Sequence, residues 1–169
     1  MTHVDLRTLK LRSGEQFSDV RSVELEPLEL GGERYLPVPE RADAAFRITR
    51  ATSGLLFELE LSARLYGPCM RCLAEAEVTA DIDASEYQAT SQAESDELVT
   101  PYVVDQRLDL SAWARDAIAL SLPDKILCRA DCAGLCPVCG LDLNAEPHDH
   151  GDAEPDARWA KLAELRDRL

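Results

Sequence analysis

The strongest pattern in the sequence is an alternation of apolar and polar residues between Leu55 and Leu65. Every second position in this run is Leu, Phe or Ala, and polar residues such as Glu58, Glu60 and Arg64 stand between them. Because successive side chains of a β-strand point to opposite faces, a period of two predicts a strand with one buried and one exposed face.

A second alternating run, from Ala74 to Ala84, follows after a short connection. Tyr66-Gly67-Pro68 is expected to break the first strand, and Cys69-Met-Arg-Cys72 comes directly after it. Two strands joined by so short a segment pair in antiparallel fashion. The sequence therefore predicts an antiparallel hairpin with a CxxC motif at its tip.

Shorter runs with strand character are expected to extend this hairpin into a sheet. They span residues 22–30, where Pro27 interrupts the alternation, and residues 35–38, 44–51 and 102–104. Residues 88–100 are polar, acidic and aperiodic, which predicts a flexible acidic loop.

Two stretches have the spacing of amphipathic helices. In the first, Asp109 or Ser111 is expected to cap a helix that Pro123 ends, with Trp113 as an anchor in the core. The second spans residues 155–169. It opens with a proline and acidic residues and closes with arginines, an order that the helix dipole favours.

These elements predict an α+β fold: an antiparallel β-sheet with a packed helix, a cysteine-rich zinc-knuckle module and a C-terminal amphipathic helix. A chain of 169 residues is long enough to bury an ordinary core, so we expect a single domain over residues 1–169. Within it, residues 20–127 are expected to form the core of sheet and helix, and residues 128–150 the zinc-binding segment.

Charge and cysteine content narrow the function classes. The chain carries 32 acidic and 18 basic residues, a formal net charge of −14, which argues against binding nucleic acid by general attraction to phosphate. The sequence has no recognisable signal peptide and no apolar run long enough for a bilayer, so we expect a cytoplasmic protein without membrane contact. Cysteines stay reduced in that compartment, and six of them indicate metal binding rather than disulfides.

The cysteines fall into pairs, and two histidines follow them. A CxxC motif occurs twice, and its tight turn aims two thiolates at one ion, as structural zinc sites require. The candidate ligands are Cys69, Cys72, Cys128, Cys132, Cys136, Cys139, His148 and His150. Eight ligands are enough for two tetrahedral sites, and a site with four protein ligands is structural rather than catalytic. We therefore predict one or two structural Zn²⁺ ions.

Spacing alone leaves the partition of these ligands open. The preferred partition combines the hairpin-tip pair with Cys128 and Cys132, and forms a second site from the other four ligands. One alternative is a single zinc ribbon from the two CxxC pairs. Another is a compact site from the four cysteines between residues 128 and 139. For His148 and His150, a solvated acidic loop is the alternative to metal binding.

Sequence features typical of enzymes are missing. There is no phosphate-binding GxxxxGK[ST] motif and no GxGxxG, GxSxG or HExxH, and the three histidines are too few and too peripheral for a catalytic triad. A thioredoxin-like redox role requires CxxC at the start of a helix rather than at a hairpin tip. We expect a protein that is not an enzyme and has no small-molecule substrate.

Three motifs between residues 20 and 144 occur in an order that points to a known family. They are the alternating strand into Cys69-Met-Arg-Cys72-Leu73, the stretch Leu108-Asp-Leu110 with a helix up to Leu122-Pro123, and the segment 128–144, which contains GLCPVCG and LDLN. In this order the chain resembles the YceD family, the large ribosomal RNA subunit accumulation proteins. One departure is His148-Asp-His150, where many members carry Cys-x-Cys, and histidine can replace thiolate at zinc.

The resemblance implies a bacterial protein that supports accumulation of large-subunit (23S) ribosomal RNA and ribosome assembly. The partner would be that RNA or a basic ribosomal protein, since an acidic surface steers basic proteins. Arg71, Arg129 and Arg64 are the candidates for RNA or partner contact, and solvated side chains or local hydrogen bonds are the alternative. The rival function is a zinc-stabilised acidic interaction or regulatory adaptor unrelated to ribosomes.

Overall fold

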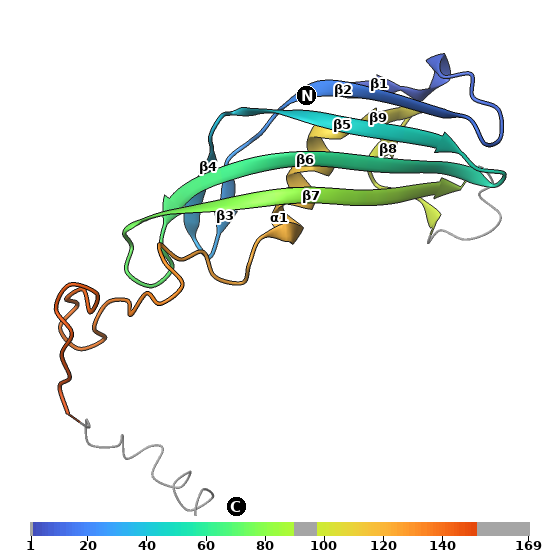
Figure 1. The fold of residues 1–169 in the computed structure, drawn as a ribbon. Helices are drawn as coiled ribbons and strands as arrows, with labels where there is room; N and C mark the ends of the chain where they lie inside the picture. The colour runs from blue at the N-terminus through green and yellow to red at the C-terminus, as the bar shows by residue number, and fades with distance from the viewer. Residues whose placement is uncertain (1, 90–97, 152–169) are drawn as a thin grey trace, which may run out of the picture.

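The largest feature of the fold is the hairpin predicted from the sequence. The structure, a computed structural model, describes residues 2–89 and 98–151. β6 (Gly54–Pro68) and β7 (Glu75–Ala89) pair antiparallel along their whole length (Figure 1). Their side chains alternate as predicted: Leu59 is fully buried, whereas Glu60 is exposed. The hairpin with CxxC at its tip is therefore confirmed.

Four further strands extend the hairpin into one large antiparallel sheet. β2 (Gln16–Glu24) pairs with β5 (Arg41–Arg50), and β5 pairs with β6, which gives the order β2, β5, β6, β7. Near the cysteine end of β6, β4 (Glu33–Pro37) pairs with β6, and β3 (Leu28–Leu30) pairs with β4. The predicted antiparallel sheet is confirmed.

A second, smaller sheet leads into the helix. β1 (His3–Asp5), β8 (Val103–Val104) and β9 (Arg107–Asp109) pair in the order β1, β9, β8, and the 3-10 helix η1 (Leu6–Thr8) follows β1. α1 (Leu110–Ser121) starts directly after β9, and the Asp109 carboxylate caps it by accepting hydrogen bonds from two backbone N–H groups of the first turn. Among the described residues, no helix has the length and apolar content to cross a membrane.

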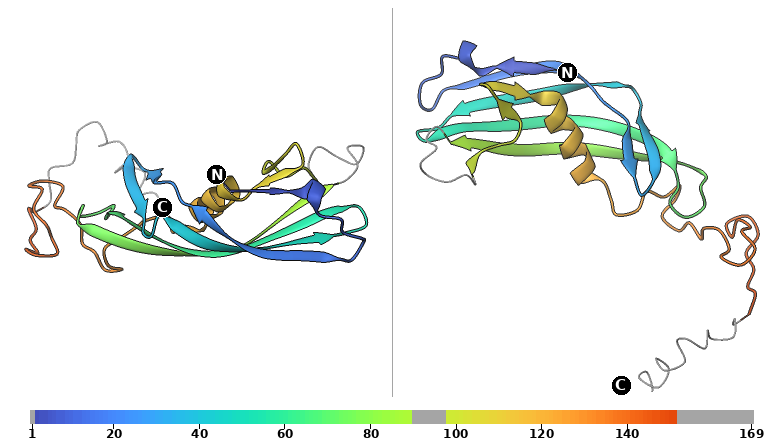
Figure 2. Two further views of the ribbon diagram at one scale, coloured as in Figure 1. Left: turned by 90° about the horizontal axis from the view of Figure 1, so that it is seen from above. Right: turned by 180° about the vertical axis from the view of Figure 1, so that it is seen from behind.

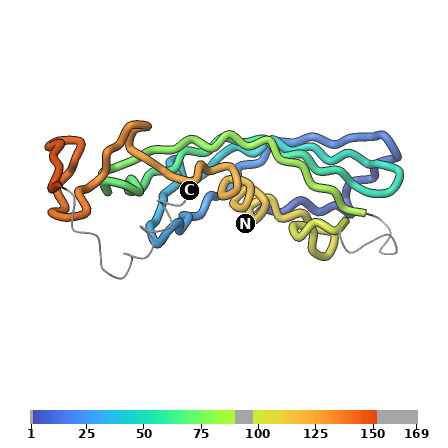
Figure 3. Tube along the Cα trace, turned by 90° about the horizontal axis from the view of Figure 1, so that it is seen from below, coloured from blue at the N-terminus to red at the C-terminus, as the bar shows by residue number. Residues whose placement is uncertain are grey.

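The core lies between the large sheet and the segments on its inner side. α1 packs against one side of the curved sheet together with the small sheet, as two further views show (Figure 2; Figure 3). Trp113 of α1 is 2% exposed and stacks on Tyr102 with ring centroids 6.0 Å apart, which confirms its predicted place in the core. Burying a side chain of this size contributes roughly 2–3 kcal/mol.

Strand bounds differ from the sequence expectations at Gly67. β6 does not break there but continues to Pro68. The ring of Tyr35 occupies the space that a Cβ on Gly67 would need, and the Tyr35 hydroxyl donates a hydrogen bond to the Pro68 carbonyl at 2.8 Å. The glycine therefore permits a packing contact inside the strand and does not end it.

The run at residues 22–30 is interrupted near Pro27, as the sequence predicts, and its two parts belong to different strands. Its first part belongs to β2, which begins six residues earlier at Gln16, and its last part is β3. Both faces of β2 carry polar residues such as Ser18 and Asp19, because it lies at the sheet edge, and this hides its period of two.

Other expectations are met only in part at the ends of the described ranges. Val4 and Leu6 precede the expected core range 20–127 and are nevertheless buried in the core. Of the expected loop 88–100, the first two residues belong to β7 and Thr100 is buried, whereas residues 90–97 lie outside the described residues. The C-terminal helix expected at 155–169 also lies outside them.

Candidate metal centres

The first group of cysteines begins at the tip of the hairpin, where backbone hydrogen bonds form a tight turn. The Cys69 N–H donates to the Ala74 carbonyl at 2.7 Å, and the Leu73 N–H donates to the Cys69 carbonyl at 3.0 Å. Leu73 closes the turn with a φ of 61°, in the left-handed region. In this turn Cys69 is fully buried and Cys72 is 8% exposed.

The chain returns to this tip after α1 and brings two more cysteines with it. The Met70 N–H donates to the Ile126 carbonyl at 2.9 Å, and the Leu135 N–H donates to the Arg71 carbonyl at 3.1 Å. These two bonds bracket the segment that carries Cys128 and Cys132. They place the second pair of cysteines beside the first pair.

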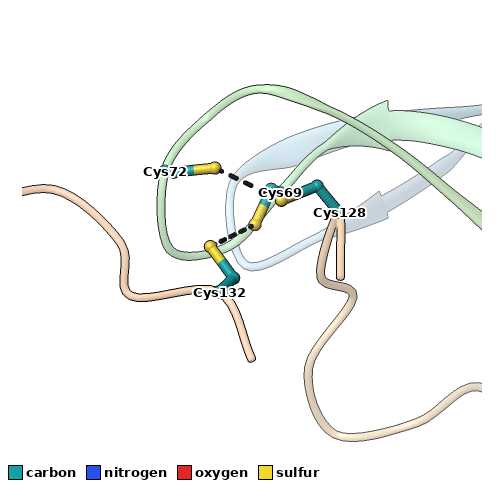
Figure 4. A group of neighbouring side chains, drawn as sticks. All are labelled: Cys69, Cys72, Cys128 and Cys132. Carbon is teal, nitrogen blue, oxygen red and sulfur yellow. Dashed lines mark hydrogen bonds between the residues drawn. The ribbon is translucent and has the colours of Figure 1, made fainter. Parts of the chain in front are cut away.

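Four sulfur atoms consequently face one another (Figure 4). Cys69 Sγ lies 3.8 Å from Cys132 Sγ, and Cys72 Sγ lies 3.5 Å from Cys128 Sγ. All four ligand atoms lie within 4.8 Å of one another, and all the cysteines are free. A tetrahedral zinc ion with Zn–S bonds of about 2.3 Å separates its sulfurs by about 3.8 Å. The first cluster, Cys69, Cys72, Cys128 and Cys132, therefore has the dimensions of a tetrathiolate metal site.

The pKa values of the thiols in this cluster favour binding of a cation. Burial raises the pKa of Cys69, but N–H groups of Cys72, Arg71 and Cys128 aimed at its sulfur outweigh burial and lower the pKa to about 6. The hydrogen bond with Cys72, followed by burial, raises the pKa of Cys128 to about 12. Without a cation, four crowded thiols cannot all ionise, whereas a divalent metal would displace the remaining protons.

Two polar side chains brace the cluster from outside. The Asn144 amide nitrogen donates to Cys132 Sγ at 3.5 Å, and its oxygen accepts from the Ala133 N–H at 2.8 Å. The Arg71 guanidinium donates to the Cys132 carbonyl at 2.6 Å. Hydrogen bonds of this kind, from residues that are not ligands themselves, orient the ligands of metal sites. The contact of Asn144 was not predicted from the sequence, where this residue counted only as part of a motif. The available signal was an Asn, with its side-chain amide donor, shortly after a CxxC knuckle.

The second cluster contains Cys136, Cys139, His148 and His150, whose ligand atoms also lie within 4.8 Å of one another. The Val138 N–H donates to Cys136 Sγ at 3.5 Å, and Cys139 Sγ lies 3.1 Å from His148 Nε2. Gly140 closes the knuckle with a φ of 75°, the left-handed conformation expected there. An N–H group of Cys139, outweighing burial, lowers the pKa of Cys136 to about 6.

The environment of His148 favours a metal ligand. Its Nδ1 lies 2.7 Å from the Glu146 carbonyl oxygen. A carbonyl only accepts hydrogen bonds, so Nδ1 carries a proton, and Nε2 is the nitrogen that can bind a metal once the ring is neutral. Metal-bound histidines commonly have this arrangement, in which the other ring nitrogen donates a hydrogen bond to a backbone carbonyl.

The ligands that the structure brings together are those of the preferred partition. The two CxxC pairs do not share one group, and the four cysteines between residues 128 and 139 do not form a compact site of their own. Both clusters can hold a metal ion by their chemistry and spacing. Zinc as that metal stays a prediction.

The three arginines proposed for partner contact are each engaged locally. Arg71 donates to the Cys132 carbonyl, as described above, and Arg129 donates to the Asn144 side chain at 2.8 Å and pairs with Asp131 at 3.3 Å. Arg64, on β6, lies 3.9 Å from the Glu77 carboxylate. Arg71 and Arg129 thus belong to the loops of the first cluster, whereas Arg64 lies on the sheet. Their role in RNA or partner contact stays a prediction.

Comparison with known protein families identifies the family of the chain that carries these clusters. The model of the family described as "Large ribosomal RNA subunit accumulation protein YceD" matches residues 57–166, a span that contains β7, α1 and both clusters. The chain belongs to the YceD family. The motifs quoted for the resemblance lie largely within the matched residues, so the family assignment made from the sequence is confirmed.

Relatives of this chain occur in mycobacteria. Uncharacterized proteins of Mycobacterium bovis and Mycobacterium tuberculosis are 33% identical to this chain in an alignment 169 residues long, which covers 96% of this chain and 80% of theirs. An uncharacterized protein of Mycobacterium leprae is 34% identical over 125 residues, or 70% of this chain and 56% of its own. No solved structure matches the chain.

Proposed function

We propose that this protein is a non-enzymatic, zinc-stabilised factor that acts in the bacterial cytoplasm and supports accumulation of 23S ribosomal RNA and assembly of the large ribosomal subunit. Membership of the YceD family, whose description names large ribosomal RNA subunit accumulation, is the observation that carries the proposal. The site chemistry agrees with a structural role for the metal, because each cluster supplies four protein ligands and leaves no position for a reacting water.

Zinc is the metal that best fits the donor sets. A tetrathiolate group and a group of two thiolates and two imidazoles are both typical of structural zinc. We propose that Cys69, Cys72, Cys128 and Cys132 hold one Zn²⁺, and that Cys136, Cys139, His148 and His150 hold a second. In this function the metals fasten the segment after α1 to the hairpin tip and give it a fixed shape.

Charge supports a basic ribosomal protein as the direct partner. A net charge of −14 repels RNA and attracts basic proteins at long range. The local hydrogen bonds of Arg71 and Arg129 leave those side chains less available to phosphate. Direct contact of Arg71, Arg129 or Arg64 with ribosomal RNA is the alternative mode of the same function.

Depletion in a bacterial host tests this function. Loss of the protein should lower mature 23S RNA relative to 16S RNA and should accumulate large-subunit precursors. The wild-type gene should restore the ratio, whereas a gene for Cys132→Ser should not. An unchanged ratio of 23S to 16S RNA after depletion would contradict the proposal.

Affinity purification at low salt separates the proposed function from its rival. Ribosomal proteins or precursor particles are expected to co-purify with the tagged chain. Their absence, together with an unchanged RNA ratio, would favour the acidic interaction or regulatory adaptor.

A further inference from the structure

In the part of the chain that the structure describes, the outer edge of β7 has no partner strand. Over its 15 residues β7 pairs with β6, and no other described strand adds a second ladder to it. In an antiparallel pair, every second residue directs its backbone N–H and C=O groups away from the partner strand. An edge of this length is therefore a template for one more strand.

A groove follows this edge. Its volume is about 410 Å³, and one wall consists of six successive residues of β7, from Asp81 to Glu86. The opposite wall is formed mainly by α1, with Trp113 and Leu120 among its side chains. The helix crosses behind the sheet and ends next to β7 (Figure 1). A groove between a strand edge and a helix is a typical site for an added peptide strand.

The two faces of β7 give this groove two different chemistries. Ile82 is 7% exposed and belongs to the core cluster that also contains Trp113. Leu120, in the last turn of α1, is 86% exposed and leaves apolar surface open on the same side. Asp81 and Asp83 alternate with Ile82 and are exposed on the other face. A strand added here would meet apolar groups on one side and carboxylates on the other.

These two carboxylates lack a basic partner among the residues that the structure describes, since none of the ion pairs there includes them. In the register of the hairpin, Asp83 stands opposite Glu60 and Asp81 opposite Ser62. Like charges directly opposite each other destabilise a sheet. A cation from a strand on the open side of β7 would relieve this repulsion.

We propose that an extended basic segment of a partner protein binds in this groove as an additional strand beside β7. Its backbone pairs with the open edge, and its alternate apolar side chains enter the side lined by Trp113 and Leu120. The Lys or Arg side chains between them face Asp81 and Asp83. The identity of the natural partner rests on the proposed function, whereas the groove itself can be tested without a ribosome.

Binding of a synthetic peptide to the full-length protein tests the groove. The probe is a fluorescein-labelled peptide of nine residues in which lysine alternates with valine, and its matched counterpart carries glutamate in place of lysine. Fluorescence anisotropy should show binding of the lysine peptide alone. The affinity should fall with added salt, because the charge pairs are exposed.

Two variants locate the binding. Asp81→Asn combined with Asp83→Asn should lower the affinity for the lysine peptide by about three- to tenfold, the size expected for two exposed cross-strand charge pairs. Leu120→Lys should also lower this affinity. Because Leu120 is exposed, the substitution does not disturb the core. Glu29→Gln combined with Glu33→Gln is the matched control, because it removes two exposed charges at β3 and β4, away from the groove. The control should bind as the unsubstituted protein does.

Hydrogen exchange supplies an independent readout. The lysine peptide should slow exchange at those β7 amides that point away from β6. If these amides are already protected without peptide, the chain itself or a second copy occupies the edge, and the proposal is wrong. Equal affinity of the Asp81/Asp83 variant and the control would also overturn it. The RNA ratio after depletion does not depend on these results, so the two proposals fail separately.

Discussion

The two candidate metal clusters have the same number of possible ligands but differ in how they are connected to the fold. The first cluster joins cysteines as far as 63 positions apart, at the hairpin tip and after α1, and three of its four cysteines are buried. The second cluster takes all its ligands from residues 136–150, and Cys139 and His150 are exposed. A link between distant segments removes more chain entropy than a local one. We therefore infer that the first cluster stabilises the whole fold and the second only its own segment.

Removing a ligand from each cluster should give the largest contrast. Cys132→Ser should abolish metal binding at the first cluster and lower the free energy of unfolding by at least about 3 kcal/mol, because metal binding and folding are coupled. Cys139→Ser should lower it by less than about 1 kcal/mol. Urea denaturation of zinc-loaded protein under reducing conditions measures both values, and equal losses would refute the contrast.

Removing the hydrogen bonds between Asn144 and the first cluster should lower the free energy of unfolding by an intermediate amount. Asn144→Ala removes the hydrogen bond to Cys132 Sγ and leaves the Ala133 N–H without its partner. The expected loss is about 1–2 kcal/mol, together with faster release of metal from the first cluster. Asn144→Asp is the matched control for the oxygen contact, because it keeps the acceptor for the Ala133 N–H. A variant with unchanged stability and unchanged metal release would show that Asn144 is not a brace.

Local sequence patterns were sufficient to predict the hairpin and α1. The alternation in β6 and β7 and the Asp109 cap are short-range features that the final structure keeps. The partition of the cysteines could be ranked but not decided, because it depends on contacts such as that between Met70 and Ile126, which are 56 residues apart. β1 was missed since three residues are too few to show a period. Gly67 was misread because its partner, Tyr35, is distant in the sequence.

Substitution of two glycines that have left-handed backbone conformations should have the smallest effects on stability. Gly134 has a φ of 82° and a Cβ there would lie 3.2 Å from the Arg71 carbonyl oxygen, whereas a Cβ on Gly140, with a φ of 75°, would meet nothing within 4 Å. Gly140→Ala should therefore cost about 1 kcal/mol of local conformational strain in the second cluster. Gly134→Ala should cost somewhat more and should also loosen the first cluster. Differential scanning calorimetry and metal content compare the two variants, and a larger effect at Gly140 would contradict this order.

Zinc content and the kinetics of zinc release test most directly whether the first cluster holds its metal more stably than the second. Protein purified under reducing conditions should contain two zinc ions per chain, and a chromogenic chelator in excess should remove one of them quickly and the other slowly. Cys139→Ser should abolish the fast phase and Cys132→Ser the slow one. Two ions released in a single phase, or a chain with six free thiols and no zinc, would contradict the account.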